Sequence, residues 1–211
     1  MSSLPGATIA PRGRETPAWH AGAAIPQRIG VQLKNEVRII SGKWKGRKLH
    51  FPPATTIRPT LGRARVTLFN WLAGYIENRR CLDLFAGSGA LGFEAHSRGA
   101  LHTTLVDADG RVVAALKDNA ARLQATNLSI LRQDALRFLK DSEQMWDLVF
   151  LDPPYDSDLL VRVFQRLSEH LTPDAIVYCE SGQPLEPPAG YLLVKRSQVG
   201  NICMSLLSSN Q

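Results

Sequence analysis

The sequence predicts an α/β domain in which helices cover both faces of a mostly parallel sheet. From residue 81 onward, short apolar strands alternate with helical patterns, and this alternation is typical of parallel sheets. Acidic residues directly follow several of these strands, at the sheet edge where such folds bind ligands. The chain has 211 residues, of which 44% are hydrophobic, so it can bury one substantial core but not two full-sized domains.

Charge and composition divide the chain into three parts. Residues 1–36 carry four prolines and no sustained periodicity, so we expect a flexible tail there. Residues 37–80 have a net charge of +9, whereas residues 81–211 have a net charge of −5. We therefore expect residues 37–80 to form a basic extension that binds nucleic acid and residues 81–211 to form the ligand-binding body. A charged hairpin that is merely solvated is the alternative.

The basic extension is predicted to contain a hairpin and a helix. Residues 37–40 and 47–51 alternate like two strands around Ser41-Gly42-Lys43, and Pro52-Pro53 ends the second strand. Residues 61–76 place apolar side chains on one helical face, which we expect to pack on the body. The candidate contacts to nucleic acid are Lys43, Trp44, Lys45, Arg47, Lys48, Arg58, Arg63 and Arg65.

The first predicted strand of the body, residues 81–85, runs into a glycine turn and then a helical pattern over residues 93–98. Gly87, Gly89 and Gly92 have the spacing of a dinucleotide-binding loop. Asp107 follows the next strand, residues 103–106, where a ribose-binding acid is expected. A nicotinamide dinucleotide would suit the glycines, but Asp83 lies close enough to repel a pyrophosphate and could instead hold an ammonium group.

A third strand is predicted over residues 128–131, after a helix over residues 111–124 and before a short helix over residues 135–140. Asp134-Ala135 follows this strand, so the Asp134 carboxylate and the Ala135 N–H could read an adenine edge. An ammonium group, ribose hydroxyls and adenine together describe S-adenosylmethionine better than a nicotinamide dinucleotide.

The strand over residues 147–151 ends in Asp152-Pro153-Pro154-Tyr155. Two prolines end the strand and hold the next turn stiff, and the Asp152 carboxylate and the Pro153 carbonyl remain as acceptors. These two acceptors suit the NH2 group of a nucleobase or amide, and Tyr155 supplies a face on which a flat ring can stack. An ordinary strand-ending turn is the alternative.

The rest of the body continues the alternation. We expect a helix over residues 159–170 and a strand over residues 175–179. Residues 191–195 and 202–207, joined around Gly200-Asn201, are predicted to form a closing antiparallel pair.

Several function classes are disfavoured by composition. No apolar run is long enough to span a membrane and the N-terminus lacks a secretory pattern, so we expect a cytoplasmic protein with no membrane partner. The three cysteines are odd in number and far apart in sequence, which favours reduced core thiols over disulfides. The five histidines have no metal-ligand spacing, and we expect no metal.

In order along the chain, the motifs Asp83 to Gly89, Asp107, Asp134-Ala135 and Asp152 to Tyr155 resemble those of the class I methyltransferases that methylate exocyclic amines. Residues 58–72 and 38–49 resemble segments of the bacterial small-subunit ribosomal RNA guanine-N2 methyltransferases. The similarity covers about residues 37–207. The sequence departs from that family at Gly62 and Val66, where the family usually carries an acid and a glutamate.

This resemblance implies a Rossmann-like fold, S-adenosylmethionine as cofactor and transfer of its methyl group to N2 of a guanine in 16S ribosomal RNA. It also implies an RNA partner within a small-subunit particle and a monomeric enzyme. Amine methylation of adenine in DNA or of glutamine in protein is the alternative, and a nicotinamide oxidoreductase or a nonenzymatic RNA-binding module explains fewer motifs. The expected catalytic residues are Asp152, Pro153, Pro154 and Tyr155. The expected cofactor-binding residues are Asp83, Phe85, Ala86, Gly87, Ser88, Gly89, Asp107, Ala108, Asp134 and Ala135.

Overall fold

A computed structural model describes residues 35–53, 60–154 and 157–210. The chain divides into two units, Met1–Leu33 and Lys34–Gln211, and the description below concerns the second. Most of the predicted tail, together with Arg58 and Tyr155, lies outside the described residues.

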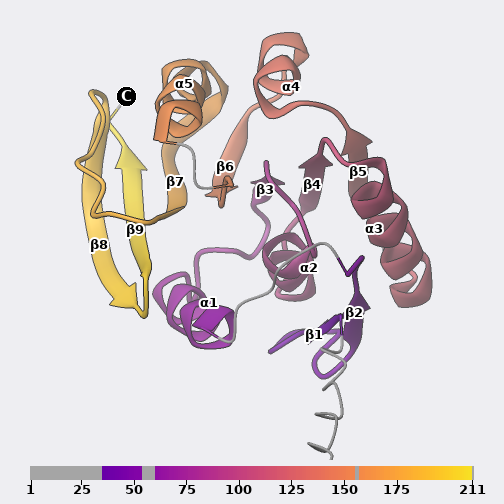
Figure 1. The fold of residues 1–211 in the computed structure, drawn as a ribbon. Helices are drawn as coiled ribbons and strands as arrows, with labels where there is room; N and C mark the ends of the chain where they lie inside the picture. Colours follow the sequence, from indigo (N-terminus) through magenta and orange to yellow (C-terminus); the bar gives the residue numbers. More distant parts are fainter. Residues whose placement is uncertain (1–34, 54–59, 155–156, 211) are drawn as a thin grey trace, which may run out of the picture. The chain divides into compact units, whose positions relative to one another are not determined.

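Seven strands form one sheet, in the order β5-β4-β3-β6-β7-β9-β8 (Figure 1). The strands are β3 Arg80–Asp83, β4 His102–Asp107, β5 Leu128–Arg132, β6 Trp146–Leu151, β7 Leu171–Ser181, β8 Tyr191–Val199 and β9 Ile202–Ser209. Strands β3 to β7 run parallel, whereas β9 is antiparallel to both β7 and β8. The predicted sheet and its closing antiparallel pair are confirmed.

Helices cover both faces of this sheet (Figure 1). On one face, α1 Thr60–Trp71, α2 Ala90–Ser97 and α3 Gly110–Leu123 contribute buried side chains to shared clusters with the strands. On the other face, α4 Ala135–Asp141 and α5 Ser157–Leu167 do the same. The direction in which successive strands are added reverses between β3 and β6. From β3 the chain continues to β4 and β5 on one side, whereas β6 lies on the other side of β3. In open parallel sheets this switch point is where ligands bind.

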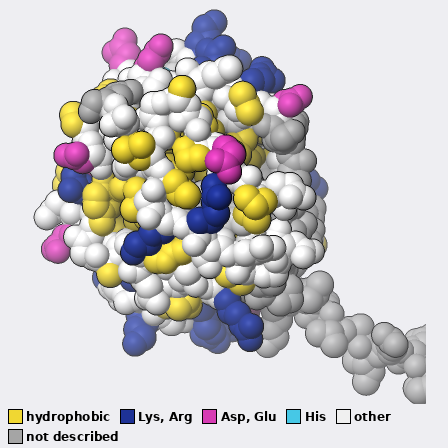
Figure 2. Space-filling model, turned by 90° about the vertical axis from the view of Figure 1, so that its left-hand side faces the viewer, with side chains coloured by type: hydrophobic (Ala, Val, Ile, Leu, Met, Phe, Trp, Pro, Cys, Tyr) yellow, Lys and Arg dark blue, Asp and Glu magenta, His cyan; other side chains and the backbone are white. Residues whose placement is uncertain are grey.

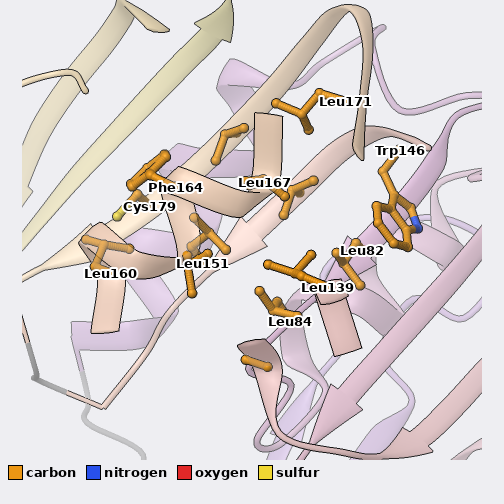
Figure 3. Close-up of a cluster of buried hydrophobic side chains, with 14 of the residues drawn as sticks. Leu82, Leu84, Leu139, Trp146, Leu151, Leu160, Phe164, Leu167, Leu171 and Cys179 are labelled. Carbon is orange, nitrogen blue, oxygen red and sulfur yellow. The ribbon is translucent and has the colours of Figure 1, made fainter. Parts of the chain in front are cut away.

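The core beneath α4 and α5 is closely packed, as Figure 3 shows for Leu82, Leu151 and Trp146 among others. Leu151 and Leu82 are fully buried and Trp146 is 1% exposed. Truncating one such leucine to alanine typically costs about 2–5 kcal/mol. This packing holds the ends of β3 and β6 rigidly.

The basic hairpin, β1 Glu36–Arg38 paired with β2 Lys48–His50, is anchored to α2. The backbone N–H groups of Ile40 and Ser41 donate to the Glu94 carboxylate at 2.6 and 3.0 Å. Ser97 accepts a hydrogen bond from the Trp44 N–H at 2.9 Å. The strands are shorter than predicted because α2 binds the backbone of the connecting loop, which cannot then extend the ladder.

Helix α1 is also shorter than its predicted range. Gly74 has a φ of +79°, which interrupts helical geometry, and the chain continues in turns from residue 72. Ile76 is nevertheless 3% exposed and packs with α1 in one cluster. The last turn of the helix predicted over residues 159–170 is a 3-10 turn, Ser168–His170.

Strand β8 is an edge of the sheet, and hydrophobic side chains gather on that side of the structure (Figure 2). Leu192, Leu193 and Val194 are 54%, 40% and 47% exposed. A register irregularity between Leu193 and Lys195 disrupts the regular edge, which discourages pairing with another strand.

Two further sequence-based expectations concern the core and the membrane. Cys81, Cys179 and Cys203 are buried free thiols, as predicted. Within the described ranges, every helix is too short or too polar to cross a bilayer.

Candidate active site

Three predicted acids meet at the carboxyl edge of the sheet. Asp83 ends β3, Asp107 ends β4 and Asp152 directly follows β6. In the sheet register, Asp83 pairs with Leu105 on one side and with Phe150 on the other. Asp107 and Asp152 therefore each lie two residues beyond a neighbour of Asp83. The parallel strand order brings together side chains that are up to 69 positions apart in the sequence.

The glycine loop after β3 is held by backbone hydrogen bonds and by Asp107. The Ala86 N–H donates to the Val106 carbonyl at 2.9 Å, and the Gly87 N–H donates to Asp107 Oδ2 at 2.9 Å. Gly89, with a φ of +75°, precedes α2, and a Cβ there would lie 2.6 Å from side-chain atoms of Phe93. Glycine is therefore required at position 89 for both its conformation and its space.

Asp83 is buried beneath this loop. Its Oδ2 accepts a hydrogen bond from the Gly92 N–H at 2.8 Å, and its side chain is 2% exposed. Burial raises the pKa of Asp83 to about 7, the Gly92 hydrogen bond opposes this rise, and the charge of Asp152 adds to it. A cation delivered by a ligand would stabilise the ionised carboxylate, so this residue suits the ammonium group of an amino acid.

Both Asp107 oxygens bind backbone N–H groups, one in the glycine loop and one in the turn before α3. Besides Gly87, the Asp109 N–H donates to Asp107 Oδ1 at 2.9 Å. Each carboxylate oxygen can accept more than one hydrogen bond, so Asp107 can hold the loop and still accept from ribose hydroxyls. Asp109 caps α3 by accepting from the Arg111 N–H at 2.8 Å, and Ala108 between them is exposed.

Asp134 lies at the start of α4, where its side chain caps the helix. Asp134 Oδ1 accepts from the Arg137 N–H at 3.0 Å. The Asp134 side chain is exposed, whereas Ala135 is buried. Asp107 pairs with Arg132, two residues before Asp134, so Asp134-Ala135 lies at the same edge of the sheet as Asp107, as predicted.

The amine-binding motif begins directly after β6. Asp152 is half-buried, Pro153 is buried and Pro154 is exposed. The burial of Pro153 fixes the turn on the core, and the Asp152 charge is close enough to raise the pKa values of Asp83 and Glu180. The predicted stacking residue, Tyr155, lies outside the described residues.

A cavity of about 740 Å³ opens beside this motif. Its walls are Pro153 and Pro154, the α5 side chains Leu160 and Phe164, and the segment over residues 181–189. Apolar walls with a few polar groups are typical of sites for small planar ligands. Its volume accommodates a nucleobase.

Sequence reasoning missed Glu180 at the end of β7. Its side chain is 5% exposed, and the Tyr178 hydroxyl donates to Glu180 Oε1 at 2.7 Å. Burial, followed by the Asp152 charge, raises the pKa of Glu180 to about 8. The rule that identified Asp107, Asp134 and Asp152, an acid at the carboxyl end of a parallel strand, would also have identified Glu180.

The basic extension presents part of its predicted contact surface. Lys43, Lys45, Arg47, Lys48 and Arg63 are exposed. Some of their charge is already engaged: Lys48 pairs with Glu36 at 3.0 Å, and the Arg47 guanidinium donates to the Arg122 carbonyl at 2.8 Å.

Two expected RNA contacts, Trp44 and Arg65, are buried instead, at 7% and 4% exposed. The Trp44 ring stacks on His96 with centroids 5.2 Å apart, and Lys43 Nζ lies 4.5 Å from its centroid, so the ring makes its contacts within the protein. Arg65 donates to the Arg38 carbonyl at 2.8 Å, and burial lowers its pKa. The structure thus corrects the expectation that these two side chains face RNA.

The two positions that depart from the family pattern are on the surface of α1. A Cβ at Gly62 would meet no atom within 4 Å, and Val66 is 46% exposed. An acid at either position would therefore be solvated, and its absence leaves no hole in the described part of the core.

Comparison with known proteins agrees with this geometry. The family described as Conserved hypothetical protein 95 matches residues 37–208. "Ribosomal RNA small subunit methyltransferase D" of Haemophilus influenzae is 41% identical over 181 residues, covering 82% of this chain and 94% of the relative. The Escherichia coli protein of the same name is 41% identical over 177 residues, covering 81% of this chain and 89% of the relative.

A solved structure gives the same result. The structure of yhhF, a candidate methyltransferase from Escherichia coli, matches with a TM-score of 0.77 at 40% identity, covering 82% of this chain and 98% of that one. The matched region runs from the basic hairpin to the last strand of the sheet, and so includes every described element of the site. The chain therefore belongs to the family described as Conserved hypothetical protein 95, alongside relatives named ribosomal RNA small subunit methyltransferase D.

Proposed function

We propose that this protein transfers the methyl group of S-adenosylmethionine to the N2 amine of a guanine in 16S ribosomal RNA. The observation that carries the proposal is the placement of Asp152 at the end of β6, beside the glycine loop that follows β3 and before the buried Pro153. A carboxylate that can accept hydrogen bonds from an amine, next to a loop proposed to bind a nucleoside, is the arrangement that direct methyl transfer requires. The names of the 41% identical relatives supply the RNA class.

The residues at the edge of the sheet fit the cofactor part by part. Asp83 offers a buried carboxyl for its ammonium group, Asp107 offers acceptors for its ribose hydroxyls, and Asp134 with the Ala135 N–H offers an adenine-reading pair. The tight approach at Gly89 keeps the loop close to α2. When bound, S-adenosylmethionine supplies an electrophilic methyl group on a positively charged sulfur.

The protein's task is then to aim the guanine amine. The lone pair of N2 is delocalised into the ring, so the amine is a weak nucleophile. The Asp152 carboxylate and the Pro153 carbonyl accept its two hydrogens and hold the lone pair toward the methyl carbon. As the N2–carbon bond forms and the carbon–sulfur bond breaks, N2 becomes positive. Asp152 stabilises this charge more than it stabilises the neutral amine, and the N2 proton then leaves to water.

The target base must be unpaired or rotated out of its helix to reach a recessed site. The exposed residues Lys43, Lys45, Arg47 and Arg63 would bind phosphates of the surrounding RNA, and Tyr155 would stack on the base. We further propose that the enzyme acts as a monomer in the cytoplasm on RNA within a small-subunit particle.

The direct test is to incubate the protein with methyl-labelled S-adenosylmethionine and undermethylated small ribosomal subunits, and to identify the labelled nucleoside by mass spectrometry. N2-methylguanosine is the expected product. Label in protein, or in DNA supplied as a competitor, with none in RNA would keep an amine methyltransferase but overturn the proposed substrate.

A further inference from the structure

Glu180 lies beside Asp152 at the edge of the sheet. Strands β6 and β7 are parallel neighbours (Figure 1), and Leu151 pairs with Cys179 in their register. Asp152 and Glu180 each follow one member of this pair, so the two acids occupy adjacent strands at the same level. Neighbouring strands lie about 4.8 Å apart. One small planar group can therefore contact both carboxylates.

The carboxylate of Glu180 is only partly used within the protein. Tyr178 donates its hydroxyl to Oε1 at 2.7 Å, whereas Oε2 accepts from no group in the described part of the chain. The residue is 5% exposed and lines the 740 Å³ cavity together with Pro153 and Pro154. A ligand in this cavity could therefore donate a hydrogen bond to the Glu180 carboxylate.

Glu180 and several apolar side chains line the same cavity. Leu160 and Phe164 of α5 form one wall, and they pack in the same cluster as Leu151 and Cys179, as Figure 3 shows. A base held beside Pro153 and Glu180 would lie next to Asp152, which directly precedes Pro153.

We propose that Glu180 is the residue that selects guanine, by accepting a hydrogen bond from N1–H of the target base while Asp152 accepts from its N2 amine. This inference rests on the proposed function and adds to it the basis of base recognition. Guanine carries N1–H and the N2 amine side by side on one edge, so two adjacent carboxylates complement that edge.

The same arrangement rejects other bases. Adenine has an unprotonated N1, whose lone pair would face the Glu180 carboxylate and repel it. Burial and the Asp152 charge raise the pKa of Glu180 to about 8, so its ionised form is costly in the empty site. An N–H donor from guanine would stabilise that form. The protonated form can itself donate to a bare N1, so we expect the full preference for guanine only above about pH 8, where the carboxylate is ionised.

Tyr178 is the positioning residue in this scheme. Its buried hydroxyl donates to Oε1 and so limits rotation of the Glu180 carboxylate. Removing the hydroxyl in Tyr178→Phe would leave the acceptor present but less firmly oriented.

The test compares two substrates that both carry the N2 amine. Once the methylated position has been mapped, 16S RNA is prepared with either guanine or 2-aminopurine at that position and assembled into subunits. 2-Aminopurine has no N1–H, so the wild-type enzyme assayed at about pH 9, where Glu180 is ionised, should prefer guanine by about 10²-fold in kcat/KM, the effect expected when a buried polar group is left unpaired. Glu180→Gln can donate to the bare N1 and should reduce this preference to about tenfold or less.

The control is Glu169→Gln, the same chemical change on an exposed side chain before the opposite end of β7. It should keep the wild-type preference. Loss of the O6 atom in 2-aminopurine affects every variant alike and cancels when the preferences are compared. Binding of S-adenosylmethionine by calorimetry should be unchanged in Glu180→Gln, since that residue is assigned to the base.

The proposal is overturned if Glu180→Gln is folded, binds S-adenosylmethionine normally and keeps the wild-type preference. If that variant does not fold, Tyr178→Phe provides the decision: a preference lowered several-fold supports the assignment, and an unchanged preference overturns it. If the wild-type enzyme makes no N2-methylguanosine in any subunit preparation, the proposed function itself fails and this inference fails with it.

Discussion

Asp152 and Asp107 lie at one edge of the sheet but have separable tasks. Asp152 faces the proposed amine, while Asp107 fastens the glycine loop through the Gly87 N–H and also accepts from the Asp109 N–H in its own turn. Their replacement should therefore affect different steps.

Asp152→Ala should lower kcat by about 10²–10³-fold, the usual effect of losing one transition-state contact, while S-adenosylmethionine affinity stays within about twofold by calorimetry. Asp107→Ala should instead weaken cofactor binding about tenfold or more, since the loop loses its anchor and the ribose its acceptor. A folded Asp152→Ala protein that cannot bind the cofactor would contradict this division of roles.

Asp83 predicts a pH effect on stability. Its pKa is raised from an ordinary 3.8 to about 7 in the folded protein. Between pH 4 and 7 the folded state keeps a proton that the unfolded state has released, so the free energy of unfolding falls as pH rises through this window. The full effect is at most about 4 kcal/mol.

Asp83→Asn removes this contribution and can still accept from the Gly92 N–H. Without cofactor, urea unfolding should show the variant gaining stability relative to the wild type at pH 8 compared with pH 5. In the variant, Glu180, whose pKa is also raised, still makes the free energy of unfolding fall as pH rises. An equal difference between the two proteins at both pH values would show that Asp83 ionises normally.

At the scale of the element, α1 begins without the acid that would favour it. Its first turn contains Gly62 and no acidic residue, and a side chain at that position would meet open space. Glycine inside a helix costs about 1 kcal/mol relative to alanine.

Gly62→Asp should consequently stabilise the protein by about 1 kcal/mol, through reduced backbone freedom and a favourable charge near the helix N-terminus, typically 0.3–1 kcal/mol. Gly62→Ala is the matched control, since it changes the backbone term without the charge. Urea unfolding of both variants at low and high salt separates the two terms. A destabilised Gly62→Asp would mean that this position has a contact that the acid disrupts.

Elements with strong periodicity could be predicted from sequence, whereas contacts between distant elements could not. The strands and the glycine loop could be predicted because buried parallel strands and glycines in left-handed conformations have local sequence signatures. Trp44 reads locally as an aromatic among lysines, yet it is buried because Ser97, 53 positions away, binds its backbone. Arg65 likewise depends on the Arg38 carbonyl. No local pattern encodes such pairings.

The same distinction between local sequence signals and contacts of distant elements applies to the site. Acids at strand ends could be identified because parallel strands bring their carboxyl ends to one edge. Their protonation could not, because the pKa of Asp83 depends on complete burial and on the charge of Asp152 across the sheet. The cavity was also beyond prediction, since one wall comes from α5 and another from the irregular 181–189 segment.

At the scale of the whole molecule, net charge is +9 in residues 37–80 and −5 in residues 81–211, so the basic segment and the body carry opposite charge. Such separation orients a polyanion on approach. Lys45 and Arg47 are exposed members of the basic segment.

Replacing both with glutamate should weaken RNA binding and reduce the slope of log K against log salt by roughly 1–2, since each lost phosphate contact removes about 0.7–0.9. The control reverses two exposed lysines outside the segment, Lys117 and Lys140, with the same net change in charge. Filter binding across a salt series measures both. If the control changes the slope as much as the test variant, net charge alone accounts for binding.

The sheet order has a consequence for how the chain is made. Strand β9 is synthesised after every other strand, yet it inserts between β7 and β8. Until residue 209 is available, the apolar edge of β7 has no partner, and the buried positions of Met204 and Leu207 are unfilled. A growing chain can therefore assemble β3 to β7 early, but the unpaired edge of β7 stays exposed until β9 has been synthesised. Prematurely stopped chains would be prone to aggregate even though they contain every proposed cofactor-binding residue.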